Sequence, residues 1–275
     1  MKNLPASDRV RPAAGPGALV LVLAAVLAFL PVFRPACLRA AEVFEAQIIR
    51  ELSHDSQCFT QGLFFDGLVR YETCGLYEAS RIIKYDAEGR RVLAKDFPGT
   101  VFAEGAVLAE GTIYVLTWQE GRVFLLDPET LETKKTLFLP RESWGLTFDG
   151  QKLWRSDGSH RLWPHRLDTL AAAGPAVEVR DGPAPAAGLN ELEYDPVSGL
   201  ILANIYGDSK IAFIDPGTGL VRYYLDARRL LRSAPPNPEA VLNGIARDGS
   251  DRLYLTGKLW PVLFETAWPK ARSPR

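Results

Sequence analysis

From residue 43 onward, apolar positions recur in short runs or alternate with polar ones, and clusters of Gly, Asp and Pro separate the runs. Alternation with a period of two is typical of half-buried β-strands, and the intervening clusters are typical of turns. This part of the chain has little convincing helical periodicity. The pattern therefore predicts an all-β protein.

A loose internal repeat organises these runs. Five similar segments open at intervals of 40 to 52 residues: 62–67 (GLFFDG), 105–111 (GAVLAEG), 145–150 (GLTFDG), 192–195 (LEYD) and 244–249 (GIARDG). A second strand-like run follows each opening, as at 113–117, and a third often ends in Asp-Pro, as at 211–216. Four strands within such a period indicate a propeller blade. We therefore expect a five-bladed β-propeller.

The two ends of the repeat array predict how the ring closes. The fifth unit ends near Glu265, too early for a fourth strand, whereas the run 43–49 (VFEAQII) has no blade of its own. A strand supplied from the N-terminus would cover two otherwise open edges. We predict that this N-terminal strand completes the last blade.

Composition narrows the functional classes. The chain has 275 residues, 47% of them hydrophobic and 24% charged, and its net charge is -1. Such a chain can bury a large core, and its scattered basic residues exclude a nucleic-acid partner. Its three histidines, including His54 on the expected first loop, show no paired metal-ligand spacing, so we expect no metal and no cofactor. We expect a monomer.

The N-terminal segment has a different character. Lys2, Arg9 and Arg11 precede an uncharged run over 18–33, which is short for a membrane span but suits the apolar region of a secretory signal. We expect residues 1–41 to be a signal peptide or an uncleaved membrane anchor. Residues 42–275 would then form a single catalytic propeller domain that is periplasmic or secreted, or anchored to the inner membrane.

Cys58 and Cys74 flank a hairpin whose turn signal is Asp66-Gly67, so counting outward places them opposite each other or one residue apart. Facing cysteines in an oxidising compartment favour a disulfide. The alternative is a pair of small buried thiols.

Chemistry-bearing residues concentrate where blades begin and where second strands end. These positions converge on one face of a propeller. They are 59–61 (FTQ), 102–104 (FAE), 144–145 (WG) and 189–191 (LNE) at the blade openings, and Trp118, Tyr206 and Lys258 at the ends of second strands. Together they hold aromatic, amide, carboxylate and ammonium groups. Apolar walls with a few polar groups are typical of a ligand pocket.

Several motifs in order resemble one family. They are 59–63 (FTQGL), 72–77 (ETCGLY), 102–105 (FAEG), 116–118 (LTW), 144–147 (WGLT), 156–159 (SDGS), 189–193 (LNELE), 242–246 (LNGIA) and 257–261 (GKLWP). Over about residues 47–265 the chain is similar to the plant- and bacterial-type glutaminyl-peptide cyclotransferases. The resemblance implies a five-bladed propeller and an acyltransferase that converts the N-terminal glutamine of peptides and proteins to pyroglutamate, releasing ammonia without a metal.

The resemblance also implies a pocket and roles within it. Its members are Phe59, Gln61, Phe102, Glu104, Trp118, Trp144, Asn190 and Lys258. We expect Glu104 to transfer protons, and Lys258, Gln61 and Asn190 to donate hydrogen bonds to the substrate carbonyl or the developing oxyanion. Tyr206 departs from the family, which usually has Trp there, so we expect a shifted substrate preference.

Other interpretations stay open at this point. Gln61 and Asn190 could satisfy backbone groups at turns, and single aromatic residues could belong to the core. A non-catalytic propeller that binds peptides or small ligands in the same aromatic pocket is the main alternative function. A lactonase-type hydrolase is disfavoured, because it would need metal-binding acids on the propeller axis.

Overall fold

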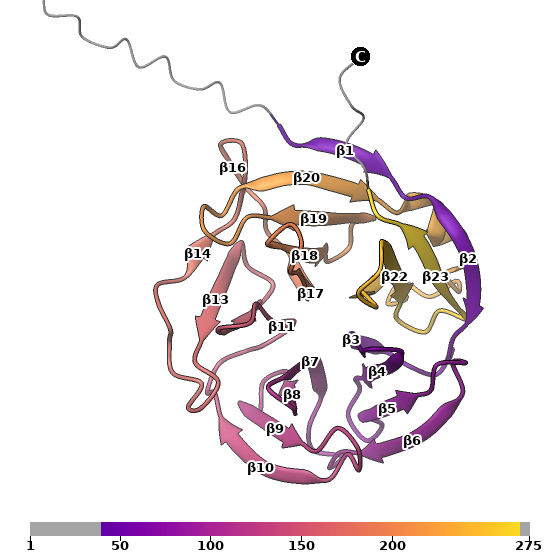
Figure 1. The fold of residues 1–275 in the computed structure, drawn as a ribbon, viewed down its shortest axis with the longest axis vertical. Helices are drawn as coiled ribbons and strands as arrows, with labels where there is room; N and C mark the ends of the chain where they lie inside the picture. Colours follow the sequence, from indigo (N-terminus) through magenta and orange to yellow (C-terminus); the bar gives the residue numbers. More distant parts are fainter. Residues whose placement is uncertain (1–39, 270–275) are drawn as a thin grey trace, which may run out of the picture. The chain divides into compact units, whose positions relative to one another are not determined.

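The five repeats form five antiparallel sheets around one axis (Figure 1). The computed structural model describes residues 40–269, and the expected leader over 1–41 lies outside this range except for its last two residues. Blade one contains β3 (Thr60–Asp66), β4 (Val69–Cys74), β5 (Arg81–Tyr85) and β6 (Arg91–Asp96). Blade two contains β7 (Ala103–Ala109), β8 (Thr112–Thr117), β9 (Arg122–Leu126) and β10 (Thr133–Phe138).

The remaining three blades follow the same order from the axis outward. Blade three contains β11 (Leu146–Phe148), β12 (Leu153–Arg155), β13 (Arg161–His165) and β14 (Val177–Glu178). Blade four contains β17 (Leu189–Asp195), β18 (Leu200–Ile205), β19 (Lys210–Ile214) and β20 (Val221–Asp226). Blade five contains β21 (Leu242–Ala246), β22 (Arg252–Gly257) and β23 (Val262–Ala267). A small hairpin of β15 (Arg180–Asp181) and β16 (Ala184–Pro185) and a 3₁₀ helix, Arg228–Ser233, lie between blades.

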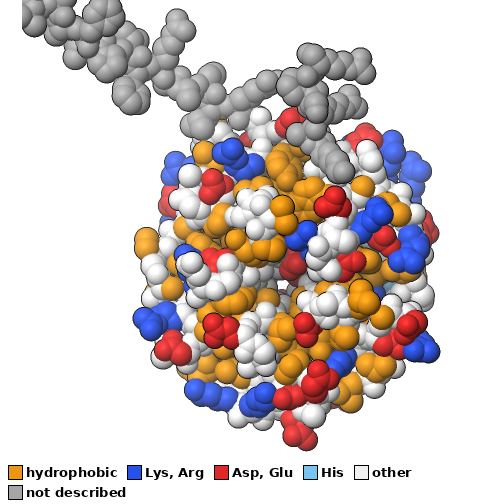
Figure 2. Space-filling model, in the orientation of Figure 1, with side chains coloured by type: hydrophobic (Ala, Val, Ile, Leu, Met, Phe, Trp, Pro, Cys, Tyr) orange, Lys and Arg blue, Asp and Glu red, His pale blue; other side chains and the backbone are white. Residues whose placement is uncertain are grey.

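The first strands close the ring. β3, β7, β11, β17 and β21 each contact the first strand of the next blade, and β21 returns to β3. The face seen in Figure 2 is hollowed at the centre of this ring, with hydrophobic and acidic side chains beside the hollow. The predicted five-bladed β-propeller is confirmed.

The N-terminal strand does complete the last blade, but the run predicted as one strand is divided between two blades. β2 (Ile48–Ser53) pairs antiparallel with β23 and becomes the fourth strand of blade five. β1 (Glu42–Glu45) instead pairs in parallel with β20 as a fifth strand of blade four. The chain changes partner at Ala46 and Gln47, which hydrogen bond to blade four and blade five respectively. The N-terminal segment therefore joins the outer edges of two blades.

Close contact between inner strands explains the glycine at most blade openings. A Cβ on Gly105 would lie 2.7 Å from the Cα of Gly145, and a Cβ on Gly145 would lie 2.1 Å from the carbonyl oxygen of Asn190. Neither contact leaves room for a side chain. Glycine therefore recurs at these positions because the inner strands of the five-bladed ring are in backbone contact.

Apolar side chains fill the seams between neighbouring blades. The seam between blades four and five contains the fully buried Phe213, Leu255 and Trp260, and comparable clusters lie between blades one and two, two and three, and three and four. The seam between blades five and one has a smaller apolar cluster: Leu63, Ala246, Tyr254 and Leu263. Other interactions therefore reinforce this last seam.

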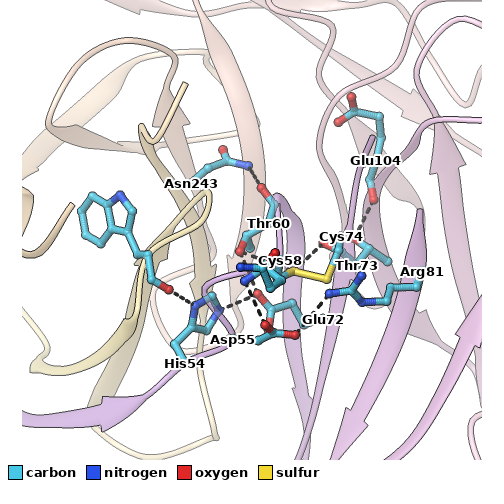
Figure 3. The surroundings of a disulfide bond; sticks show 12 residues. His54, Asp55, Cys58, Thr60, Glu72, Thr73, Cys74, Arg81, Glu104 and Asn243 are labelled. Atoms are coloured by element: carbon cyan, nitrogen blue, oxygen red, sulfur yellow. Dashed lines mark hydrogen bonds and ion pairs between the residues drawn. A yellow bond between two sulfur atoms is a disulfide. The ribbon is translucent and has the colours of Figure 1, made fainter. Parts of the chain in front are cut away.

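A disulfide and a buried ion pair lie beside it (Figure 3). The disulfide joins Cys58 to Cys74, as predicted. His54 lies on the predicted loop but is buried, and its Nε2 is 2.7 Å from Oε1 of Glu72. Burial disfavours the charged form of both groups, but the partner's charge and the hydrogen bonds together outweigh it, so the pKa of His54 is raised and the pKa of Glu72 is lowered. Nδ1 of His54 also lies 2.6 Å from the carbonyl oxygen of Trp260, which links blade one to blade five.

Candidate active site

A cavity of about 480 Å³ opens where the first strands begin. All nine residues predicted to form the pocket line it, together with two that were not predicted: Phe59, Gln61, Leu76, Phe102, Glu104, Trp118, Trp144, Asn190, Tyr206, Glu239 and Lys258. The structure thus brings together residues from every blade.

Blade geometry explains this convergence. In an antiparallel blade the first strand begins at the same end at which the second strand finishes. Gln61, Glu104 and Asn190 lie in β3, β7 and β17 near their starts, whereas Trp118 and Lys258 directly follow β8 and β22. Similar blades therefore place their side chains around one opening.

Glu104 is buried at the inner end of the cavity and is held from two sides. Gln61 Nε2 donates a hydrogen bond of 3.0 Å to the Glu104 carboxylate oxygen Oε1, and Gln61 Oε1 accepts one of 3.3 Å from Asn243. Thr73 Oγ1 donates a hydrogen bond of 2.7 Å to the backbone carbonyl of Glu104. In Figure 3 the Glu104 carboxyl group points away from the disulfide, while its backbone carbonyl faces Thr73. Asn190 is also buried.

Aromatic rings form the walls of the cavity. The ring centroid of Phe102 lies 6.1 Å from that of Phe59 and 5.7 Å from that of Trp118, both in edge-to-face geometry. Between blades three and four, Trp144 packs edge-to-face on Tyr206 at 5.5 Å. Tyr206 is 45% exposed and forms part of the rim. These contacts fix the shape of an apolar, aromatic opening above buried polar groups.

Comparison with known proteins places the chain in a family. A family profile described as glutamine cyclotransferase matches residues 20–267. A glutaminyl-peptide cyclotransferase of Arabidopsis thaliana is 32% identical over 237 residues, which cover 83% of this chain and 73% of the relative. The structure of the Myxococcus xanthus glutaminyl cyclase matches with a TM-score of 0.76 and 39% identity, over 82% of this chain and 97% of that one. The chain belongs to the glutamine cyclotransferase family. It is therefore an acyltransferase, as its motifs predict.

In this glutamine cyclotransferase, burial sets the ionisation of the two charged groups in the cavity. Burial raises the pKa of Glu104 well above its ordinary range; Lys258 opposes this, while the charges of Glu120 and Glu142 add to it. Burial lowers the pKa of Lys258, against the opposing charges of Glu104 and Glu239. Burial therefore favours the uncharged form of both Glu104 and Lys258.

Lys258 also lies against aromatic faces. Its Nζ is 4.6 Å from the ring centroid of Phe59 and 5.6 Å from that of Tyr206. Cation–π attraction to desolvated rings favours the charged ammonium. The two rings therefore hold a donor inside the cavity.

The sequence analysis did not predict two residues that line the cavity of this glutamine cyclotransferase. Leu76 follows β4 with a φ of +92° and turns toward the cavity. It belongs to the motif 72–77, which could have identified it. Glu239 is exposed and follows a Pro-rich stretch outside any strand, so no strand pattern in the sequence indicates it.

Within residues 40–269, no group of three or more His, Cys, Asp or Glu side chains is arranged to hold a metal ion. No helix in this part of the cyclotransferase is long and apolar enough to cross a lipid bilayer.

Proposed function

We propose that this enzyme converts the N-terminal glutamine of peptides and proteins to pyroglutamate by intramolecular aminolysis, without a metal ion. The observation that carries the proposal is the buried Glu104–Gln61 pair at the end of an aromatic cavity, with Lys258 beside it. The N-terminal sequence pattern supports export, so the substrates would be periplasmic or secreted peptides.

The reaction joins two ends of one residue. The free α-amine attacks the side-chain carboxamide carbon, a C–N bond forms, and a tetrahedral oxyanion results. The bond to the amide nitrogen then breaks, ammonia leaves, and a five-membered lactam remains. Holding the glutamine in its folded conformation supplies much of the acceleration, because the reacting atoms then start close together. The aromatic walls suit this task.

Glu104 is suited to moving the proton. The attacking amine loses a proton as the C–N bond forms, and the leaving nitrogen must gain one. A carboxylate whose pKa burial has raised accepts a proton near neutral pH more readily than an ordinary glutamate does. Gln61 fixes its orientation through a hydrogen bond of 3.0 Å. We assign Glu104 both transfers.

The remaining polar groups are donors. Lys258, Gln61 and Asn190 all line the cavity and carry N–H groups that can stabilise the negative oxygen of the tetrahedral intermediate. Lys258 carries the positive charge in this set, so we assign it the largest share of this stabilisation.

The proposal is tested by incubating the purified protein with a Gln-Ala-Ala peptide and measuring ammonia release and the matching loss of peptide mass. We expect acceleration over spontaneous cyclisation that survives treatment with a chelator. A peptide with an acetylated amine is the control and should not react. Binding of the Gln peptide without acceleration would overturn the enzyme proposal and favour a non-catalytic peptide-binding propeller.

A further inference from the structure

One carboxylate joins the two tryptophan walls of the cavity. Oε1 of Glu142 accepts a hydrogen bond of 2.8 Å from the indole Nε1 of Trp118 and one of 3.0 Å from the indole Nε1 of Trp144. Trp118 follows β8 in blade two, whereas Trp144 precedes β11 in blade three. Glu142 itself is exposed and is absent from the residues that line the cavity in the described ring. It therefore contacts both walls from outside.

Hydrogen bonds from blade three anchor the segment that carries Glu142. Arg155 is buried, and its Nη1 donates a hydrogen bond to the backbone carbonyl of Glu142. Nε of Arg155 lies 3.4 Å from Nε2 of His165, and Nδ1 of His165 lies 2.8 Å from the carbonyl oxygen of Leu170. A donor at Arg155 requires an acceptor at Nε2, so Nδ1 carries the proton of a neutral imidazole. This series of contacts fixes the backbone from which the carboxylate reaches the two indoles.

We propose that Glu142 is a positioning residue for cyclisation, which sets the orientation of Trp118 and Trp144 relative to each other and so the fold of the bound glutamine. The inference rests on the function proposed above. An indole free to turn about χ1 and χ2 would present edge or face to the substrate, and a folded substrate needs one of these surfaces in place. Hydrogen bonds to a charged acceptor hold both rings more firmly than neutral ones would.

Two variants separate reach from charge. Glu142→Asp keeps the charge but is one methylene shorter, so it cannot span both indoles. Glu142→Gln keeps the reach and an acceptor oxygen but loses the charge. We expect Glu142→Asp to raise KM for a Gln peptide about tenfold, the equivalent of one lost charge-assisted hydrogen bond, and Glu142→Gln to raise it less than about threefold.

The indole N–H signals in a nitrogen–proton NMR spectrum report on the rings directly. The chain has six tryptophans, and Trp118→Phe and Trp144→Phe assign the two signals concerned. We expect Glu142→Asp to move at least one of these two signals upfield, because a hydrogen bond to a carboxylate is lost. In the Trp118→Phe/Trp144→Phe background, Glu142→Asp should add no further rise in KM.

Glu120→Gln is the matched control. Glu120 also acts on Glu104 through its charge, but it accepts hydrogen bonds from the Tyr77 hydroxyl at 2.8 Å and the Phe102 backbone N–H at 3.4 Å, and none from either indole. The charged groups that act on Glu104 are Lys258, Glu120 and Glu142. Both Glu→Gln variants should therefore move the acid limb of the pH profile to lower pH, while Glu142→Asp should not. Glu120→Gln should leave both indole signals in place.

Wild-type KM in Glu142→Asp, with both indole signals unmoved, would overturn the inference. An equal rise in KM in Glu142→Asp and Glu120→Gln would also overturn it, because charge alone would then explain the effect. If the wild-type protein cyclises no peptide, the proposed function fails. The indole signals then still decide whether Glu142 holds the two rings, since they require no substrate.

Discussion

Two glutamates are buried to a similar extent. One lies at the inner end of the cavity, and the other lies behind it on the propeller axis. Glu104 and Glu191 are both almost fully buried, and burial raises the pKa of each well above its ordinary range. Glu104 faces the cavity and receives one hydrogen bond from a side chain. Glu191 receives hydrogen bonds from backbone N–H groups of two other blades, Ile245 at 2.8 Å and Leu63 at 3.4 Å.

The difference shows that burial sets the direction of a pKa shift, while the partners decide what the group can do. Glu191 stands where the other four blade openings have glycine, at positions 62, 105, 145 and 244. Its side chain joins three inner strands, and its neighbour Glu193 raises its pKa further. A carboxyl group enclosed by backbone donors is a structural element. The one that faces a cavity can exchange protons with a substrate.

The largest expected effect separates the two carboxyl groups by activity. Glu104→Gln should lower kcat about a thousandfold, because the amide cannot transfer the proton, and leave the melting temperature nearly unchanged. Glu191→Gln should retain most activity, since a neutral carboxyl and an amide have nearly the same shape. Steady-state kinetics of both variants check this, and equal losses of kcat would remove the distinction.

Glu191→Ala tests the same comparison through stability. It leaves the N–H groups of Leu63 and Ile245 without their acceptor and opens a cavity at the axis, so we expect a loss of about 3 kcal/mol in the free energy of unfolding. Glu191→Gln keeps an acceptor oxygen and should lose less than half of this. Urea unfolding measures both, and a wild-type midpoint in Glu191→Ala would show that the axis does not depend on this residue.

The pH dependence of kcat/KM should also distinguish Glu104 from Glu191. Glu104 must be deprotonated to accept a proton, so activity should rise with pH through its raised pKa and fall as Lys258 loses its proton at a lowered pKa. Glu120→Gln removes a charge that raises the pKa of Glu104, so it should move the acid limb to lower pH. The substrate amine, with an ordinary pKa of about 8, titrates equally in both enzymes.

Glu191→Gln is the control for this profile, because it should leave the acid limb in place. An acid limb at the ordinary glutamate pKa of about 4.3 in the wild-type enzyme would contradict the role of Glu104.

The smallest expected effect concerns the rim. Tyr206→Trp introduces the residue that the family resemblance predicts at this position and should change kcat/KM by less than about tenfold, because one aromatic wall replaces another of similar size. The larger apolar surface should favour peptides with an apolar second residue over those with a polar one. Competition between two such peptides measures the ratio, and an unchanged ratio would show that Tyr206 does not select substrates.

The sequence predicted the ring and most of its cavity because both depend on features repeated in every blade. Gly105 and Gly145 mark inner strands in backbone contact, and the strand ends nearby carry Glu104 and Trp144. Repetition made these local signals readable across long separations. This regularity identified the stretches that line the cavity, and the resemblance to the family selected the pocket residues within them.

What the sequence did not reveal depends on contacts between unlike segments. Glu142 lies on an exposed loop and looks like an ordinary solvated charge, although it accepts two indole hydrogen bonds. His54 was expected on a loop and is there, but only the meeting of blades five and one buries it against Glu72. The division between β1 and β2 likewise depends on which blade edges are free, and a hydrophobic run alone does not specify this.

The N-terminal segment has a consequence for the order in which the protein can be made. Residues 42–53 are among the first of the domain to be synthesised, and the partner of β2 is β23, its last described strand. The early strand therefore has no partner until almost the whole chain has left the ribosome. Ring closure joins the oldest part of the chain to the newest, so a ribosome-bound domain remains an open array of blades until synthesis is nearly finished.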